Sequence, residues 1–376
     1  MNNGVKKNFI SNFISDLSGQ GTIRNVWPFS TINAIYGPKQ ELVNNWFHIF
    51  VKDPLVLTMS RTLYFQRQMN PNQLPHLKEY KANQNHFGYR MVWDMDDMVW
   101  GYNEYQGGSS EHGIPAYNAS WKHIPKETKE TSVEVMNLMD ELSFSTKFLA
   151  DYVKNKLNVN VPSVVIPNTV PMAYWGDQRR QPVFKKIKKP VILYSGSPTH
   201  YNNYERLKGD WTDEWIYWVK KSVNAGEIDF HCMGGIPFFF EDIKDKIHIY
   251  PWVQIFKMHL IIDSIKPDFC INPLVPNDFN YGKSDLKRVE SSAGGMVCMG
   301  TVFKNGKPSP YDQCSMRAPY GIDVNGIDEL FDKFTEPDVF NAEIERQYNW
   351  MHEEGRYTEL PKNINRLLDF ILGEKK

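Results

Sequence analysis

The sequence is poor in cysteine and contains no long apolar run, and each absence argues against a class of protein. Its four cysteines (Cys232, Cys270, Cys298 and Cys314) lie far apart along 376 residues, and none forms a Cys-x-x-Cys pair. A structural zinc site is therefore not expected, and the first three thiols, which lie in apolar stretches, are interpreted as buried and reduced. No stretch approaches the ~20 consecutive apolar residues of a membrane-spanning helix, so no transmembrane segment is expected.

A net charge close to zero also limits the kinds of partner. The chain has 43 basic and 44 acidic residues, which argues against non-specific coating of nucleic acid. The basic run 179–189 is interpreted as a solvated linker or, as an alternative, as a local basic groove. Residues 1–14 lack the apolar core and the cleavage site of a secretory signal, so the expected location is the cytoplasm, or the host cytoplasm if the protein is viral.

What is present is an alternation of short β-rich runs with longer helical patterns, in two halves. In the first half, strands are expected at 55–58, 89–93 and 164–166, and helices at 40–50 and 145–157. In the second half, strands are expected at 191–194, 228–232, 247–250, 269–271 and 296–299. The alternation predicts an α/β fold with parallel sheets covered by helices on both faces. His231 and His248 alternate with apolar residues in two of these strands and are interpreted as core histidines.

Chain length and a proline-punctuated break predict two domains. Pro171, Pro182 and Pro190 interrupt a polar segment that has no apolar periodicity. The expected division is a first domain at 1–170, a linker at 171–189, a second domain at 190–340 and a helical C-terminal segment at 341–376. Gly355 and Pro361 interrupt the helical pattern of that last segment.

The most informative segment, residues 280–295, follows one expected strand and leads into another. In an open parallel sheet, ligands bind beyond the carboxyl ends of the strands, where a loop that feeds a helix offers backbone N–H groups to a phosphate. Lys283 adds a positive charge for a pyrophosphate, and Glu290, two turns along on the same predicted helix, can accept both hydroxyls of a ribose. The segment predicts a nucleotide site, with an ordinary capped helix as the alternative.

The lysine-serine-aspartate start of this segment at 283–285, its Glu290 and its Gly294-Gly295 end resemble the donor-binding helix of the GT-B glycosyltransferases. The resemblance implies two facing Rossmann-like domains with a cleft between them. The first domain would bind the acceptor and the second the nucleotide-sugar, and a C-terminal helical segment would pack back toward the first domain. Many retaining members carry a pair of glutamates. Here Gly282 stands at the first position, which leaves retention and inversion of stereochemistry both open.

Further stretches are similar to the same family in order and spacing: the loops 18–24 and 194–200, the turn 250–253, and 143–149 together with 165–168. The resemblance implies that the donor is bound by Gly19, Gly21, Ser195, Gly196, Ser197, Thr199, His200, Trp252, Val253, Lys283, Ser284, Asp285 and Glu290. In this interpretation, the backbone amides of 195–199 face the diphosphate and the turn 250–253 contacts the nucleobase.

An acidic cluster follows the strand expected at 89–93. Asp94, Asp96 and Asp97 lie in the acceptor half, where a general base is needed within hydrogen-bond reach of the attacking hydroxyl. His112, in the loop before 114–118, is the second candidate for that base. Two alternatives stay open for the cluster: an aspartate motif that binds magnesium or manganese, as in the other large glycosyltransferase fold, and a capping cluster of surface charge.

The predicted activity is transfer of a sugar from a nucleotide-sugar, expected to be a UDP-sugar, to a hydroxyl acceptor, without a cofactor or an essential metal. An arginine-bearing strand, the acidic cluster and the Ile-Pro-x-Tyr-Asn loop at 114–118 look similar to glycosyltransferases of bacterial viruses, some of which modify DNA. The first expected acceptor is therefore a 5-hydroxymethylpyrimidine base in phage DNA. A cell-surface glycan or lipid-linked precursor is the second, and a non-catalytic nucleotide-sugar or glycan-binding module is the third interpretation. The sugar, the nucleobase and the oligomeric state are left open.

Overall fold

The computed structural model describes residues 9–14, 21–36, 43–46, 54–67, 69–98, 127–177, 179–196, 200–304 and 306–373. These residues form two compact units, and each is described by itself. Unit 1 contains the described residues up to 98, together with 127–171 and 355–373, and unit 2 contains 172–354. The segment expected as a linker thus belongs to unit 2 from Met172 onward. The expected C-terminal segment is divided, with 341–354 in unit 2 and 355–373 in unit 1.

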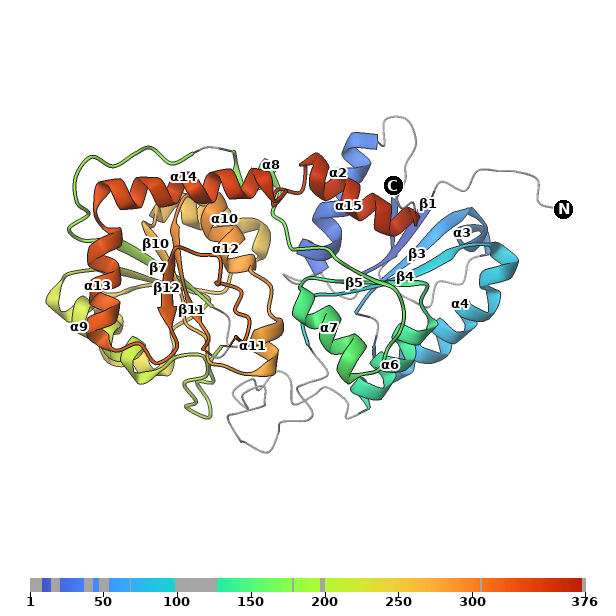
Figure 1. Ribbon diagram of the computed structural model, residues 1–376, viewed down its shortest axis with the longest axis horizontal. Coiled ribbons are helices and arrows are strands. Elements are labelled where there is room, and N and C mark those ends of the chain that lie inside the picture. Colours follow the sequence, from blue (N-terminus) through green and yellow to red (C-terminus); the bar gives the residue numbers. More distant parts are fainter. Residues whose placement is uncertain are drawn as a thin grey trace. The chain divides into compact units, whose positions relative to one another are not determined.

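Unit 1 is built on a parallel sheet with the strand order β2-β1-β3-β4-β5-β6 (blue to green in Figure 1). Its strands are β1 Phe9–Phe13, β2 Val43–Trp46, β3 Ser60–Gln66, β4 Arg90–Met95, β5 Glu141–Phe144 and β6 Ser163–Val165. Its helices are η1 Thr22–Val26, α2 Trp27–Tyr36, α3 Pro54–Met59, η2 Pro71–Gln73, α4 Leu74–Phe87, α6 Thr128–Leu138, α7 Lys147–Lys156 and α15 Pro361–Leu372.

Helices cover both faces of the unit 1 sheet, because successive residues of a buried strand point to opposite sides. On one face, Tyr64 of β3 packs with Phe29 of α2 and Phe370 of α15. On the other face, Phe65 packs against Tyr80 of α4, with ring centroids 5.8 Å apart. The sheet is therefore the middle layer of three.

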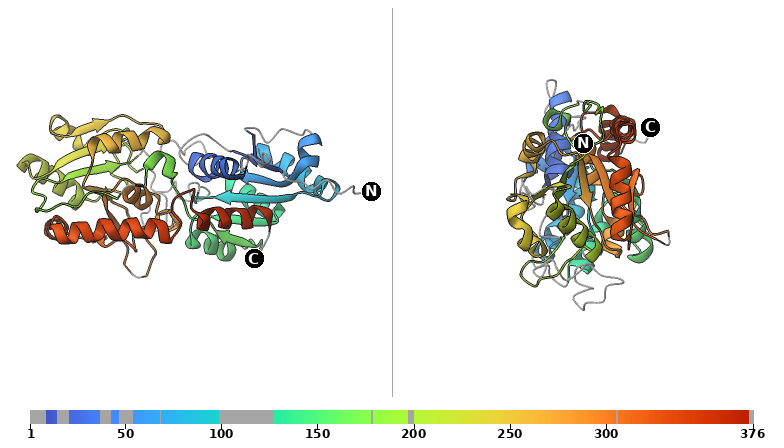
Figure 2. Two further views of the ribbon diagram at one scale, coloured as in Figure 1. Left: turned by 90° about the horizontal axis from the view of Figure 1, so that it is seen from above. Right: turned by 90° about the vertical axis from the view of Figure 1, so that its left-hand side faces the viewer.

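The last described helix, α15, is fastened to the first half of the chain. Figure 2 (left) shows it alongside the strands of unit 1. Thr62 Oγ1 of β3 donates to the Ile371 carbonyl at 2.8 Å, and Arg61 Nη2 donates to the Leu372 carbonyl at 3.1 Å. The carbonyl groups at the end of α15, which have no partner within the helix, are thus satisfied by side chains of β3.

Unit 2 is built on a second parallel sheet, with the order β12-β11-β10-β7-β8-β9. Its strands are β7 Val191–Ser195, β8 Asp229–Met233, β9 His248–Tyr250, β10 Phe269–Asn272, β11 Val297–Val302 and β12 Met316–Pro319. Its helices are α8 Met172–Trp175, α9 Asp213–Ala225, η4 Phe238–Lys246, α10 Ile255–Ile265, α11 Asp278–Gly282, α12 Leu286–Ala293, α13 Val324–Phe334 and α14 Pro337–Glu353.

The main core of unit 2 lies on one face of its sheet, under α9 and α13, which are side by side in Figure 1. Phe331 of α13 stacks on Trp218 of α9 with ring centroids 4.5 Å apart. Cys270 of β10 alternates with the core residue Ile271 and faces the other side of the sheet, where α12 packs on β10 and β11. All four cysteines are buried and unpaired, which confirms the prediction for the three in apolar stretches.

Two elements predicted for the first half are wrong in type. Residues 55–58, expected as a strand, lie in helix α3, because Pro54 suits the first turn of a helix, where its missing N–H costs nothing. The strand follows as β3. Residues 43–46, within the helix expected at 40–50, form β2, which pairs with β1; the rest of that prediction lies outside the described residues. The other predicted strands each overlap an observed strand. None of the helices in the described ranges has the length and apolarity that a membrane crossing requires.

Candidate functional site

In unit 2, charged side chains gather at the edge of the sheet where the parallel strands end. β7 ends at Ser195, and β10 ends at Asn272, after which the chain passes through α11 and α12. Lys287, in the first turn of α12, donates to Ser195 Oγ at 3.2 Å. Lys283, just after α11, lies with its Nζ 3.5 Å from His200 Nδ1. Loops after two neighbouring strands therefore bring two lysines and a histidine together.

Asp210 is the shared acidic partner of this group. Its Oδ2 lies 2.7 Å from His200 Nδ1 and 3.6 Å from Lys283 Nζ, and its Oδ1 accepts from Asn280 Nδ2 at 2.8 Å. The side chain is 1% exposed. Burial raises the pKa of Asp210, but the charge of Lys283 and the hydrogen bond to His200 outweigh it and lower the pKa to about 2. Asp210 is therefore ionised at neutral pH.

His200 is held in one orientation by Asp210. Burial and the charge of Lys283 lower the pKa of His200 below its ordinary value, although Asp210 acts in the opposite direction. A neutral imidazole with its Nδ1–H donated to Asp210 keeps Nε2 as a hydrogen-bond acceptor. This nitrogen suits a hydroxyl of a ligand better than a phosphate oxygen.

Glu290 lies in α12 and is only 3% exposed. Its Oε2 accepts from Lys287 Nζ at 2.8 Å. The prediction that Lys283 and Glu290 lie on one helix is wrong, because Lys283 caps α11 and α12 begins only at Leu286. The N–H groups in the first turn of α12 and the side chains of Lys283 and Lys287 together give the N-terminal end of this helix a positive charge, which suits a diphosphate.

Gly196, the glycine after β7, was predicted to offer its backbone amide to the diphosphate, but the structure gives it another role. Its amide donates to the Met233 carbonyl at 3.1 Å, so this N–H does not face a ligand. A Cβ at Gly196 would lie 2.2 Å from Tyr194 Oη, so the buried tyrosine ring is what requires glycine here. Ser197 and Thr199 lie outside the described residues, as does Gly19.

The remaining predicted donor residues fall in several places. Trp252 and Val253 follow β9, and the Trp252 side chain is 63% exposed. Ser284 and Asp285 lie between α11 and α12, where the Asp285 carbonyl accepts the first backbone hydrogen bonds of α12. Gly21 belongs to unit 1, where it precedes η1 as its N-cap. Among the described donor candidates, Ser195 and Glu290 both contact Lys287, and His200 lies next to Lys283.

In unit 1, Asp94 at the end of β4 is fully buried in an ion pair. Arg24 Nε donates to Asp94 Oδ2 at 3.0 Å, and Arg24 Nη2 and Ser143 Oγ both donate to Oδ1. Arg24 Nη1 also donates to Asn168 Oδ1 at 3.1 Å. Because both carboxylate oxygens already accept hydrogen bonds, the structure argues against the predicted role of Asp94 as a general base. For the same reason Asp94 is unsuited to the metal alternative.

The next acidic residue, Asp96, has different surroundings. It is 4% exposed, and its Oδ1 has no hydrogen-bond partner within the part of the chain that the structure describes. Burial and the charge of Asp97 raise the pKa of Asp96 to about 7, although Arg67 and Arg24 act in the opposite direction. A carboxyl group that titrates near neutral pH suits a general base. Asp97 is half-buried, and His112 lies outside the described residues.

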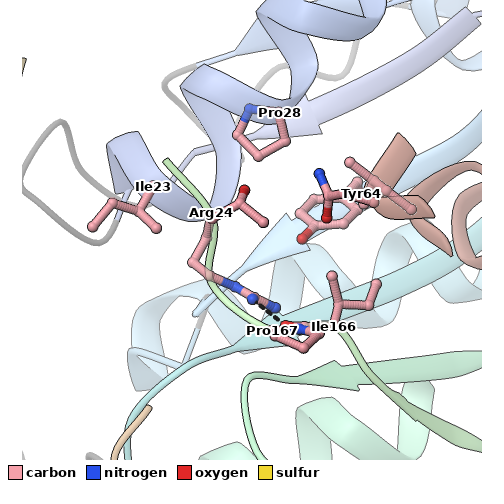
Figure 3. Close-up of a pocket in the computed structure, with 9 residues that line it drawn as sticks. Ile23, Arg24, Pro28, Tyr64, Ile166 and Pro167 are labelled. Atoms are coloured by element: carbon pink, nitrogen blue, oxygen red, sulfur yellow. Dashed lines mark hydrogen bonds between the residues drawn. The ribbon is translucent and has the colours of Figure 1, made fainter. Parts of the chain in front are cut away.

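A small cavity lies beside Arg24 (Figure 3). It is lined by Ile23, Arg24, Pro28, Tyr64, Ile166, Pro167, Thr169, Asn363 and Leu367. The guanidinium extends between Tyr64 and Ile166, where Nη1 donates to the Ile166 carbonyl, and the side chain is 4% exposed. The hydrogen-bond donors of Arg24 are therefore directed into unit 1, where the side chain connects η1 with β4 and with the chain after β6.

Three residues of these groups were not predicted from sequence: Arg24, Asp210 and Lys287. The signal for Asp210 is the preceding Gly209, which has φ +64, and a Cβ there would lie 2.0 Å from the His200 carbonyl. A glycine that permits such a close approach marks a turn that returns to the histidine loop. Lys287 could have been found from its i,i+3 spacing to Glu290.

No family model matches the chain, and no curated protein matches it. Solved structures do. The Anabaena protein HepE in complex with UDP and glucose is 9% identical, covers 97% of this chain and 99% of its own, and superposes with a TM-score of 0.54. HepE in complex with UDP-glucose is also 9% identical, covers 96% and 98%, and gives a TM-score of 0.53. A sucrose-phosphate synthase from Thermosynechococcus elongatus is 10% identical, covers 91% of this chain and 95% of its own, and superposes with a TM-score of 0.46.

The likeness to HepE over nearly the whole chain shows the fold. The chain has the GT-B fold, with two parallel-sheet α/β units and a helical C-terminal part. This confirms the predicted fold class. At such low identity the likeness says nothing of the reaction, because one fold supports many functions.

Proposed function

We propose that the protein is a glycosyltransferase that takes its sugar from a UDP-sugar bound by unit 2. The observation that carries the proposal is the convergence of Lys283, Lys287 and His200 beyond the carboxyl ends of β7 and β10. Ligands of open parallel sheets bind at that edge. HepE, which shares the fold, is known in complexes with UDP and glucose and with UDP-glucose.

The proposed chemistry is a displacement at the anomeric carbon of the sugar. The bond from that carbon to the diphosphate oxygen breaks, and a bond to the acceptor oxygen forms. The two lysine ammonium groups and the N-terminal end of α12 neutralise the charge that develops on the leaving UDP. Asp96 in unit 1 is our candidate for the group that accepts the proton of the acceptor hydroxyl, because its pKa is about 7. Fixed positive side chains supply this neutralisation, so we propose a metal-independent reaction.

For the acceptor, we put a 5-hydroxymethylpyrimidine base in phage DNA first and a glycan or lipid-linked precursor second. The DNA proposal rests on the sequence resemblance. The basic run 179–189 adds little to it, because Arg180 pairs with Asp268 and Lys186 pairs with Asp332 within unit 2. Both DNA and glycans should therefore be tested as acceptors.

The test is an activity assay with UDP-glucose, other UDP-sugars and sugars on other nucleotides, each with and without EDTA. Acceptors are hydroxymethylcytosine DNA, hydroxymethyluracil DNA, unmodified DNA and a set of glycans, and products are identified by mass spectrometry. We expect one product with an added sugar, formed equally in EDTA, and lost in Lys283→Met and Glu290→Ala. Lys220→Met is the matched control, since Lys220 pairs with Asp242 on the surface of unit 2.

Other outcomes are informative. A mass gain on one modified base would establish DNA as the acceptor, whereas a gain on a glycan alone would overturn the DNA proposal. Saturable UDP binding without transfer or donor hydrolysis would favour the non-catalytic module. The presence of Gly282 at the position of the first glutamate supports that alternative. Absence of nucleotide binding, measured by calorimetry, would overturn the glycosyltransferase proposal.

A further inference from the structure

Two histidines of unit 2 lie close together next to an aspartate, away from the group of Lys283, Lys287 and His200, here called the lysine cluster. Asp229 and His231 are two residues apart on β8 and so share one face of that strand. His231 is opposite His248 in the parallel register of β8 and β9. Their rings are stacked, with centroids 4.3 Å apart. The prediction that both are core histidines holds for His231 but is wrong for His248, whose side chain is 55% exposed.

The atoms that can bind a metal lie close to one another. Asp229 Oδ1 lies 3.0 Å from His248 Nε2, and Asp229 Oδ2 lies 3.5 Å from His231 Nε2. One ligand atom from each of the three residues lies within 4.8 Å of the others. Bonds of about 2.0–2.2 Å to a tetrahedral zinc ion place its ligand atoms about 3.3 Å apart. The two separations from Asp229 are thus close to those of a bound site.

The buried histidine is also held in an orientation that suits a metal. Tyr250 Oη lies 3.0 Å from His231 Nδ1, which leaves Nε2 directed at Asp229. Metal-binding histidines are commonly oriented in this way by a hydrogen bond on the second ring nitrogen.

We propose that Asp229, His231 and His248 form a binding site for a divalent transition-metal ion, Zn²⁺ being the probe of choice. Two imidazoles and one carboxylate suit Zn²⁺ better than Mg²⁺ or Ca²⁺, which prefer oxygen ligands. The fourth position is left to water on the exposed side of His248. This site is independent of the proposed glycosyl transfer.

The position of the site suggests what a bound ion does. Asp229 is the first residue of β8 and His248 the first of β9, whereas the lysine cluster lies at the opposite ends of the strands, near Ser195. β9 is a short strand at the edge of the sheet and pairs only with β8 among the described strands. An ion bridging Asp229 and His248 therefore stabilises the folded state by fastening this edge strand.

The test is titration of the full-length, EDTA-treated and desalted protein with Zn²⁺ by calorimetry, and with Co²⁺ by visible absorption. We expect one equivalent of each ion to bind, and the Tm to rise with Zn²⁺ concentration. His248→Ala should weaken Zn²⁺ binding more than about 100-fold, beyond the roughly 10–100-fold that loss of a supporting hydrogen bond costs. Circular dichroism checks that the variant is folded. Because the His248 side chain is 55% exposed, its removal leaves no cavity in the core.

A matched control is His352→Ala, because His352 Nε2 also lies 2.8 Å from a carboxylate, that of Asp177, but without a second histidine. It should bind Zn²⁺ as the wild type does. Tyr250→Phe should weaken Zn²⁺ binding about tenfold, by releasing His231 Nδ1. The proposal is overturned if the wild type binds no stoichiometric Zn²⁺, or if His248→Ala binds it with unchanged affinity and shows the same rise in Tm.

Discussion

Each unit contains a deeply buried aspartate that pairs with basic residues, and the two pairings differ in how far the partners are exposed. In unit 1, Asp94 is 0% exposed and Arg24 is 4% exposed, so the pair is closed on both sides. In unit 2, Asp210 is 1% exposed, whereas His200 is 21% and Lys283 is 17% exposed. The aspartate of unit 2 is enclosed, but its partners reach the surface of the unit.

The difference separates a structural ion pair from the group that we propose binds the nucleotide. The guanidinium of Arg24 donates to Asp94, Asn168 and Ile166, so its hydrogen-bonding capacity is directed into the protein. Lys283 meets Asp210 at 3.6 Å, a distance of charge attraction rather than of a short hydrogen bond. An ammonium held in this way keeps donors for a ligand. Charge alone in a sequence does not distinguish the two situations.

The largest effect is expected at Asp96, the second acidic residue of unit 1. Asp96→Asn should lower kcat/KM about 10²–10⁴-fold, as loss of a general base does. In the wild type, kcat/KM should rise as the pH passes about 7, where Asp96 loses its proton. Asp151→Asn, which removes an exposed carboxylate paired with Lys147, is the control. Full activity of Asp96→Asn with an unchanged pH profile would exclude Asp96 as the base.

The raised pKa of Asp96 also predicts a pH dependence of stability, which can be measured without a substrate. The folded protein keeps the Asp96 proton up to a pH of about 7, whereas the unfolded chain releases it near the ordinary value of 3.8. The free energy of unfolding should therefore fall as the pH rises between these values. Urea denaturation at several pH values should show this slope in the wild type and a smaller one in Asp96→Asn.

The buried pair of unit 1 should show its effect in stability rather than in binding. Asp94→Asn leaves the Arg24 charge without its partner and should lower the free energy of unfolding by about 3–5 kcal/mol, with unchanged affinity for UDP. The double variant Arg24→Met/Asp94→Leu removes both charges and should recover much of that loss. Urea denaturation measures both. A loss of UDP affinity in folded Asp94→Asn would contradict the contrast between the two units.

The lysine of unit 2, in contrast, should affect nucleotide binding. Lys283→Met should weaken UDP binding about 10–100-fold, since hydrogen bonds to charged groups contribute about 1.5–3 kcal/mol. Its Tm should also fall, because buried Asp210 then lacks the charge that contributes most to lowering its pKa. Calorimetry with UDP is the measurement, and Lys220→Met the control. If Lys283→Met unfolds more easily but binds UDP normally, Lys283 is structural like Arg24.

The smallest effect is expected at Asp210, which acts through its neighbours. Asp210→Asn should weaken UDP binding up to about tenfold, by loosening His200 and Lys283. Because the folded pKa of Asp210 is lowered to about 2, its contribution to stability is complete above pH about 4 and is lost as the pH falls toward 2. Acid denaturation should therefore be less steep in Asp210→Asn over that range. An identical profile in both proteins would contradict the ion-pair assignment.

The buried strands of unit 2 were predictable because each is a short apolar run, the pattern that a parallel strand covered on both faces requires. β2 was not, because its pairing with β1 rather than its own composition makes it a strand. Lys283 and Glu290 were visible as a local motif. The partners that decide their roles were not, since Asp210 reaches Lys283 and Arg24 reaches Asp94 only through the tertiary fold. Sequence patterns register neighbours along the chain, whereas burial and ion pairing depend on neighbours in space.

The attachment of α15 to β3 has a consequence for the order in which the protein is made. The described residues of unit 2 all lie between 172 and 354, whereas unit 1 needs residues 355–373 to cover the face that Tyr64 and Phe29 share. During synthesis, the chain for unit 2 is therefore complete before unit 1 can close. The nascent first half would wait with an uncovered apolar surface, a state that favours chaperone binding. The domain begun first on the ribosome is thus finished last.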